Sequence, residues 1–165
     1  MGRRGVILWR LSIRRYARTF DGGYGLANSG RWNSIGHRIT YMATSPSLCA
    51  LEKLVHVEDP SLLPELDMIA YDAPDDISST AVDLSDLPPD WISGQHLTQA
   101  RGDRWLTNKT EAIMFVPSAV IPLHRSPDVN VLVNHAHPDA VRIKIAAITP
   151  FVFDARLLPQ PIPQP

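Results

Sequence analysis

The sequence is poor in cysteine and in long apolar runs. Cys49 is the single cysteine among 165 residues, which excludes an internal disulfide and is typical of a reducing compartment. No stretch approaches the ~18 consecutive apolar residues of a membrane span, and the apolar run at residues 5–9 ends at Arg10. We therefore expect a cytoplasmic protein that does not engage a membrane.

The chain also lacks a strong net charge. Lys and Arg number 16 against 17 Asp and Glu, so the formal charge is -1 and gives no overall field to attract a polyanion. This argues against direct binding of nucleic acid. The exception is the N-terminus, where residues 1–18 contain six arginines and form a local basic segment.

Two common site signatures are missing. The glycine-rich stretch "DGGYGLANSG" does not follow the G-x-G-x-x-G spacing of a Rossmann dinucleotide site. The segment "NHAHPDA" brings His135, His137 and Asp139 close together, but Pro138 favours a turn and no Cys/His pair accompanies them. We therefore expect no metal site.

The elements that are present predict an α+β domain. With 44% hydrophobic residues the chain can build one core, so we expect a single domain over residues 1–158, followed by a disordered proline-rich tail over residues 159–165. Apolar and alternating patterns predict strands at residues 5–12, 38–43, 65–73, 78–84, 111–118, 129–134 and 141–154, and a helix at residues 95–107. Many strands with few helices indicate α+β rather than a regular βαβ series.

A long loop precedes the best-marked helix. Residues 21–36 hold five glycines and two asparagines, and loops of this length inside a compact domain are usually functional. The helix begins after Ser45 as the N-cap, with Pro46 as its first residue. On a helical wheel, Leu48, Leu51 and Val55 form the predicted buried stripe, and Glu52 lies beside it.

Three side chains in this region suggest chemistry. A carboxylate at Glu52 is costly beside an apolar stripe unless it has partners or a task. Arg31 on the glycine-rich loop is suited to clamp a pyrophosphate, and the ring of Tyr41 can stack on a heterocycle. In isolation a structural role explains each residue better: a boundary glutamate bonded to a strand, a solvated or ion-paired arginine and ordinary strand packing.

Together these residues carry a resemblance. The run "GRWNSIGHRITYMATSPSLCALEKLVH", followed by "MFVPSAVIP", "NVLVNHAHPDA" and "FVFDARLL", resembles the RES-domain family, the toxins of RES-Xre toxin-antitoxin modules. The resemblance implies that Arg31, Tyr41, Glu52, Ser118 and Asn134 occupy the family's functional positions. It also implies a split, bent, mixed sheet similar to that of the ADP-ribosyltransferases, with NAD+ as substrate.

The implied reaction breaks the bond between nicotinamide and ribose and transfers ADP-ribose. Glu52, Arg31 and Tyr41 are the implied catalytic residues, and Arg31, Tyr41, Ser118 and Asn134 the NAD-binding ones. The acceptor stays open between water, phosphate and a protein side chain. The resemblance further implies an Xre-like DNA-binding antitoxin that covers the active site. The alternative is a non-catalytic module that binds a protein through the glycine-rich loop and the basic N-terminus.

Overall fold

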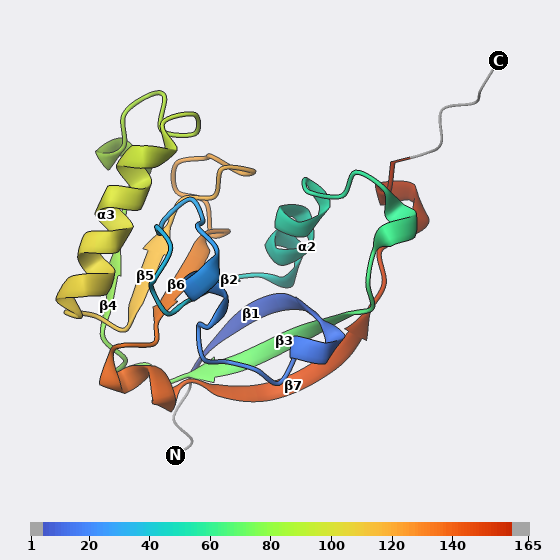
Figure 1. Ribbon diagram of the computed structural model, residues 1–165, viewed down its shortest axis with the longest axis horizontal. Coiled ribbons are helices and arrows are strands. Elements are labelled where there is room, and N and C mark those ends of the chain that lie inside the picture. Colours follow the sequence, from blue (N-terminus) through green and yellow to red (C-terminus); the bar gives the residue numbers. More distant parts are fainter. Residues whose placement is uncertain (1–4, 160–165) are drawn as a thin grey trace.

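One mixed sheet of seven strands forms the centre of the molecule (Figure 1), in the order β4-β5-β6-β2-β1-β3-β7. The computed structural model describes residues 5–159. Its strands are β1 (Val6–Ile13), β2 (Ile39–Ala43), β3 (Leu66–Ala73), β4 (Ser79–Ala81), β5 (Ile113–Val116), β6 (Asn130–Asn134) and β7 (Lys144–Phe151). Neighbouring strands are antiparallel except β4 and β5, which are parallel.

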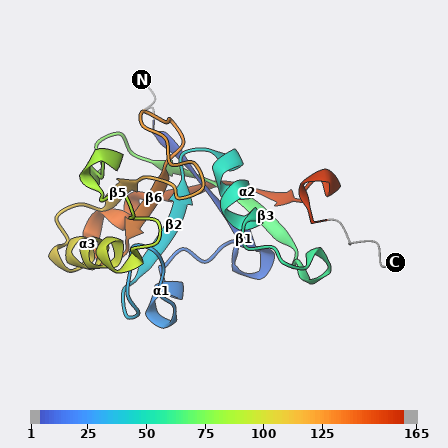
Figure 2. The same cartoon turned by 90° about the horizontal axis from the view of Figure 1, so that it is seen from above.

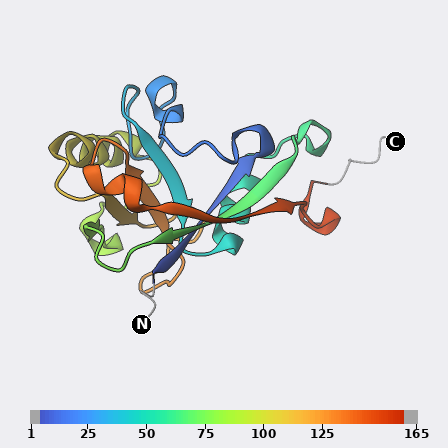
Figure 3. The ribbon, with the colours of Figure 1, turned by 90° about the horizontal axis from the view of Figure 1, so that it is seen from below.

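The sheet is divided where β1 meets β2, because a single residue pair, Trp9 opposite Ala43, joins these strands. By contrast, β1 and β3 pair along the full length of β1. One half-sheet is therefore β4-β5-β6-β2 and the other is β1-β3-β7. In Figure 3 the long strands of the second half run at a clear angle to β2. The α+β class and the split, bent, mixed sheet predicted from the sequence are confirmed.

The predicted strands are all present, with differences at their ends. The segment 78–84 contributes only the short β4, and β7 starts at Lys144 because the residues before it form a 3-10 helix. The helices are α1 (Tyr24–Ala27), α2 (Pro46–Leu54) and α3 (Gln95–Asn108), with 3-10 helices η1 (Arg14–Tyr16), η2 (Pro60–Leu62), η3 (Leu84–Asp86), η4 (Pro138–Arg142) and η5 (Ala155–Leu157).

Helix α2 begins as predicted but buries a different side. The Oγ of Ser45 accepts a hydrogen bond from the Leu48 N–H at 3.2 Å, which confirms the N-cap. Leu48 and Cys49 are buried, whereas Leu51 is 36% and Val55 58% exposed. The predicted stripe is therefore wrong at Leu51 and Val55. The helix ends at Leu54, and its contact with the sheet runs through adjacent residues 48 and 49 rather than along a continuous stripe.

Both larger helices cover the same face of the sheet (Figure 2). Trp105 of α3 belongs to a core cluster with Trp32 and Leu132, and Leu48 of α2 belongs to a second cluster with Ala43. Side chains that alternate with these along β2 and β6 point to the opposite face, where a third cluster lies. The face between α2 and α3 therefore receives every second residue of β2 and β6.

Parts of the sequence predictions fall beyond these residues. The predicted disordered tail, residues 159–165, lies outside the described residues except for Pro159, as do Arg3 and Arg4 of the basic N-terminus. Within residues 5–159, no helix is both long and apolar enough to cross a membrane.

Candidate active site

Glu52 lies at the centre of a polar cluster that joins α2 to β6 and to the segment after β5. Its Oε1 accepts a hydrogen bond from Ser118 Oγ at 2.8 Å and another from Asn130 Nδ2 at 2.7 Å. Two donors on one oxygen stabilise its negative charge. The other oxygen, Oε2, has no hydrogen-bond partner among residues 5–159, and the side chain is only half-buried. This oxygen is available to a ligand.

Ser118 is oriented by its own backbone neighbours. It is fully buried two residues after the end of β5, and its Oγ accepts hydrogen bonds from the N–H groups of Val120 (3.0 Å) and Ile121 (3.1 Å). Because these two donors occupy the lone pairs of the hydroxyl, its one proton is directed at Glu52. Ser118 therefore acts here as a fixed donor to the carboxylate.

Arg31 is held by one side of its guanidinium. Its Nη1 donates to the carbonyl of Ile92 at 2.7 Å and to that of Trp91 at 3.4 Å, and the guanidinium lies 5.5 Å from the centre of the Trp91 ring. Nε and Nη2 have no hydrogen-bond partner in the described part of the chain. Together they form the edge with which arginine binds a phosphate through two parallel bonds.

The hydroxyl of Tyr41 fixes the loop that carries Arg31. It donates to Asn33 Oδ1 at 2.7 Å and accepts from the Trp32 N–H at 3.0 Å. A Cβ on Gly30 would lie 2.5 Å from this hydroxyl oxygen, so the approach requires glycine. Burial raises the pKa of Tyr41 above its ordinary value, so the hydroxyl stays protonated and cannot serve as a base.

Asn134 lies apart from this cluster. It is buried at the other end of β6 from Asn130, where its Nδ2 donates to the Leu106 carbonyl at 3.1 Å and its Oδ1 accepts from the Ala136 N–H at 3.0 Å. The structure thus brings Asn130, and not Asn134, to Glu52. The sequence shows that an asparagine is available on this strand face, because "NVLVN" has one at each end. It does not show which of the two ends lies next to α2.

The elements place these groups on one face of the sheet. Tyr41 and Asn130 both point to the side covered by α2 and α3, since each alternates with residues of the opposite cluster. Glu52 approaches from α2, and Arg31 is held beside the start of α3. The Glu52 carboxylate and the Arg31 guanidinium are therefore held on the same face of the sheet, the first at α2 and the second beside the start of α3.

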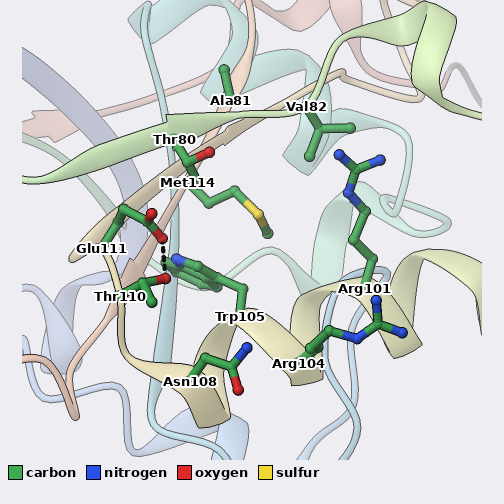
Figure 4. Close-up of a pocket in the computed structure, with 10 residues that line it drawn as sticks. All are labelled: Thr80, Ala81, Val82, Arg101, Arg104, Trp105, Asn108, Thr110, Glu111 and Met114. Carbon is green, nitrogen blue, oxygen red and sulfur yellow. Dashed lines mark hydrogen bonds between the residues drawn. The ribbon is translucent and has the colours of Figure 1, made fainter.

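A separate pocket of about 250 Å³ lies between α3 and β4 (Figure 4). It is lined by α3 residues including Arg101, Arg104 and Trp105, and by β4. None of the predicted site residues lines it. Arg101 and Arg104 therefore line a pocket that contains no predicted site residue, and Arg101 lies 3.7 Å from Asp86.

The histidines of "NHAHPDA" have structural partners. His135 Nε2 lies 2.8 Å from Thr40 Oγ1, and His137 Nδ1 accepts from the Asp139 N–H at 3.1 Å at the start of η4. Within residues 5–159, no group of three or more His, Cys, Asp or Glu side chains is arranged to hold a metal ion.

Comparison with known proteins agrees with this architecture. The family model of the RES domain matches residues 7–154. A protein named Toxin Res from Pseudomonas putida is 38% identical, over 92% of this chain and 99% of its own length. The Prs ADP-ribosylating toxin of a Sphingobium species is 29% identical, over 91% of this chain and 95% of its own length.

The fold also has a match among solved structures. The crystal structure of the Mycobacterium tuberculosis MbcT-MbcA toxin-antitoxin complex contains a chain with a TM-score of 0.67 and 16% identity, which covers 89% of this chain and 84% of that one. With a family model that spans nearly its whole length and a relative of 38% identity, this chain belongs to the RES domain family.

Proposed function

We propose that this protein is the toxin of a toxin-antitoxin module, and that it cleaves the nicotinamide–ribose bond of NAD+ and passes ADP-ribose to an acceptor. The names of its relatives support the toxin role and the use of ADP-ribose. The observation that carries the proposal is the Glu52 carboxylate, which is fixed through Oε1 while Oε2 is open to a ligand.

The chemistry requires a negative charge close to the ribose. The nicotinamide ring of NAD+ is cationic and takes the electron pair of the C–N bond as it leaves, so its departure needs no acid. Positive charge develops on the ribose, as in glycoside hydrolysis. Oε2 of Glu52 accepts a hydrogen bond from a ribose hydroxyl and stabilises this cation, with Ser118 and Asn130 holding the carboxylate in place.

Arg31 and Tyr41 orient the dinucleotide. The Nε and Nη2 edge of Arg31 binds the pyrophosphate, and the contacts of Nη1 with Trp91 and Ile92 hold the guanidinium before the ligand arrives. The ring of Tyr41 packs on the nicotinamide or its ribose while its hydroxyl stays in the loop. Ser118 acts through Glu52. Asn130 replaces Asn134 as the asparagine of this site.

The second half of the reaction completes the transfer. An oxygen of the acceptor forms a bond to the ribose carbon that lost nicotinamide and releases its proton. Water gives hydrolysis of NAD+, phosphate gives phosphorolysis, and a protein side chain gives mono-ADP-ribosylation. The first two deplete NAD+ directly, and each of the three would arrest growth.

An Xre-like antitoxin is the proposed partner, covering the face between α2 and α3. The solved neighbour is a toxin-antitoxin complex. Apolar side chains that a partner would bury are exposed on the two helices and the turn before α3, namely Leu51, Ile92 and Leu97, with Val55 directly after α2.

The first test measures nicotinamide released from NAD+ by the purified protein, with and without phosphate or cell extract. We expect release by the native protein and a loss of ~10²-fold or more in Glu52→Gln, which is nearly isosteric. Glu58→Gln removes an exposed carboxylate in the segment after α2 and should be fully active. Full activity of Glu52→Gln would contradict the role of Glu52.

Labelled NAD+ then identifies the acceptor. Label on a protein band indicates transfer to protein, whereas soluble ADP-ribose or its phosphorylated form indicates water or phosphate. If the native protein releases no nicotinamide under any of these conditions, the non-catalytic binding module is the better explanation.

A further inference from the structure

We infer that residues 91–99, which lie outside every predicted site position, form a positioning element for Arg31. This inference rests on the proposed function, because it assigns Arg31 to the pyrophosphate. The 91–99 segment comprises the turn before α3 and the first turns of that helix.

The segment holds the backbone end of Arg31. Thr98 Oγ1 donates to the Arg31 carbonyl at 2.6 Å. One residue earlier in the loop, the Gly30 carbonyl accepts from Gln95 Nε2 at 3.1 Å and from Gln99 Nε2 at 2.9 Å. The spacing of i, i+3 and i+4 places all three donors on one face of α3.

The same segment holds the other end of the side chain. The carbonyls of Trp91 and Ile92 accept from Arg31 Nη1, and the Trp91 ring lies beneath the guanidinium. The backbone carbonyl of Arg31 and its guanidinium are therefore both hydrogen-bonded to one stretch of nine residues. An arginine held in this way loses less conformational freedom when it binds a phosphate.

The contact between α3 and the loop includes a buried polar side chain. Thr98 is completely buried although it is polar, and its hydroxyl points to a loop carbonyl instead of only to its own helix. Farther along α3, Asp103 Oδ1 accepts from the Ser34 N–H at 2.8 Å. The loop from Gly30 to Ser34 is thus bonded to α3 by side chains on successive turns, and Arg31 lies within that bonded stretch.

The test is the KM for NAD+ in nicotinamide release. Thr98→Val keeps the shape and removes the donor, so we expect KM to rise about fivefold to tenfold with kcat nearly unchanged, since the pyrophosphate is bound equally before and during bond cleavage. Thr98→Ser restores the hydroxyl and should restore KM. Thr107→Val makes the same chemical change at an exposed position of α3 and should have no effect.

A second variant distinguishes a change in KM from a loss of folding. Gln95→Ala combined with Gln99→Ala changes side chains that are not buried, and we expect the same rise in KM with little change in melting temperature. A lower melting temperature with KM unchanged in both variants would mean a purely structural role and would overturn the inference. The effect of Thr98→Val on KM should also vanish in an Arg31→Ala background, and a persistent effect would overturn it as well.

Failure of the proposed function gives a different pattern. If the native protein releases no nicotinamide, the affinity for ADP-ribose, measured by calorimetry, replaces KM in the same comparison of variants. Native binding that weakens in Thr98→Val and recovers in Thr98→Ser supports the positioning role without the reaction. Absence of binding by the native protein would overturn both proposals.

Discussion

Asn130 and Asn134 point to the same face of β6 but have different surroundings. Asn130 donates to Glu52, whereas Asn134 is enclosed and satisfies the backbone of Leu106 and Ala136. We predict that Asn130→Ala lowers the rate of nicotinamide release roughly 10-fold to 100-fold, because the Glu52 carboxylate loses one of its two hydrogen bonds. We expect little loss of stability. Release assays and thermal unfolding of the purified variant check this.

Asn134→Ala is the matched control. It leaves the buried carbonyl of Leu106 and the N–H of Ala136 without their side-chain partner, so we expect it to lower the free energy of unfolding by about 1–3 kcal/mol while the folded protein retains its rate. If instead Asn134→Ala removed activity in a fully stable protein and Asn130→Ala did not, the assignment of Asn130 to the site would be wrong.

His135 predicts a dependence of stability on pH. Burial lowers its pKa from 6.5 to about 4, and the neighbouring charges, Asp21 against Arg10 and Arg38, change this less. Between these two values the unfolded chain binds the proton and the folded chain does not, so stability falls as the pH drops from about 6.5 towards 4. The full effect is on the order of 3 kcal/mol.

The measurement compares urea unfolding of the native protein and His135→Gln between pH 4 and 7. Glutamine can still bond to Thr40 Oγ1 but does not titrate in this range. Carboxylates contribute equally to both proteins, so the difference between the two slopes belongs to His135. Equal slopes would show that His135 has an ordinary pKa in the folded protein.

At the scale of elements, α3 meets the loop that carries Arg31 through a glycine. A Cβ on Gly102 would lie 1.8 Å from the Trp32 carbonyl oxygen, which real structures do not tolerate. We predict that Gly102→Ala destabilises the protein by about 3 kcal/mol or more. Urea unfolding measures the change.

The sign of this effect is diagnostic. In a helix interior without such a contact, alanine is more favourable than glycine by ~1 kcal/mol, so stabilisation by Gly102→Ala would contradict the close packing. Gly94→Ala at the start of the same helix is the control, because its nearest contact would be 3.3 Å from the Asp90 carbonyl oxygen. We expect a much smaller change there.

The elements also show what a sequence can predict. Ser45 and Pro46 located the start of α2, because capping is decided by neighbouring residues. The buried side of α2 was mispredicted at Leu51 and Val55, since a short helix with apolar residues on several sides is oriented by the sheet beneath it. The presence of Glu52 at a boundary position was predictable, but its bond to Asn130 depends on which end of β6 meets α2.

At the scale of the whole molecule, the strand patterns and the resemblance were enough to predict the class of fold. The position at which the sheet divides was not predictable. Only Trp9 and Ala43 pair between β1 and β2, and no local sequence pattern marks these two residues. The attachment of Arg31 to the 91–99 segment was equally hidden, since those residues are about 60 positions apart in the chain.

The narrow joint between β1 and β2 leaves the cohesion of the two half-sheets largely to their side chains. Two of the core clusters contain residues of both half-sheets, so side-chain packing, and not only the one backbone pair, holds the halves together. Glu52 lies at this joint, because α2 packs against both β1 and β2, and its partners Ser118 and Asn130 come from the half that contains β2. The position of the Glu52 carboxylate therefore depends on the packing between the two halves, and a substitution in either half that changes this packing would move the carboxylate relative to Ser118 and Asn130.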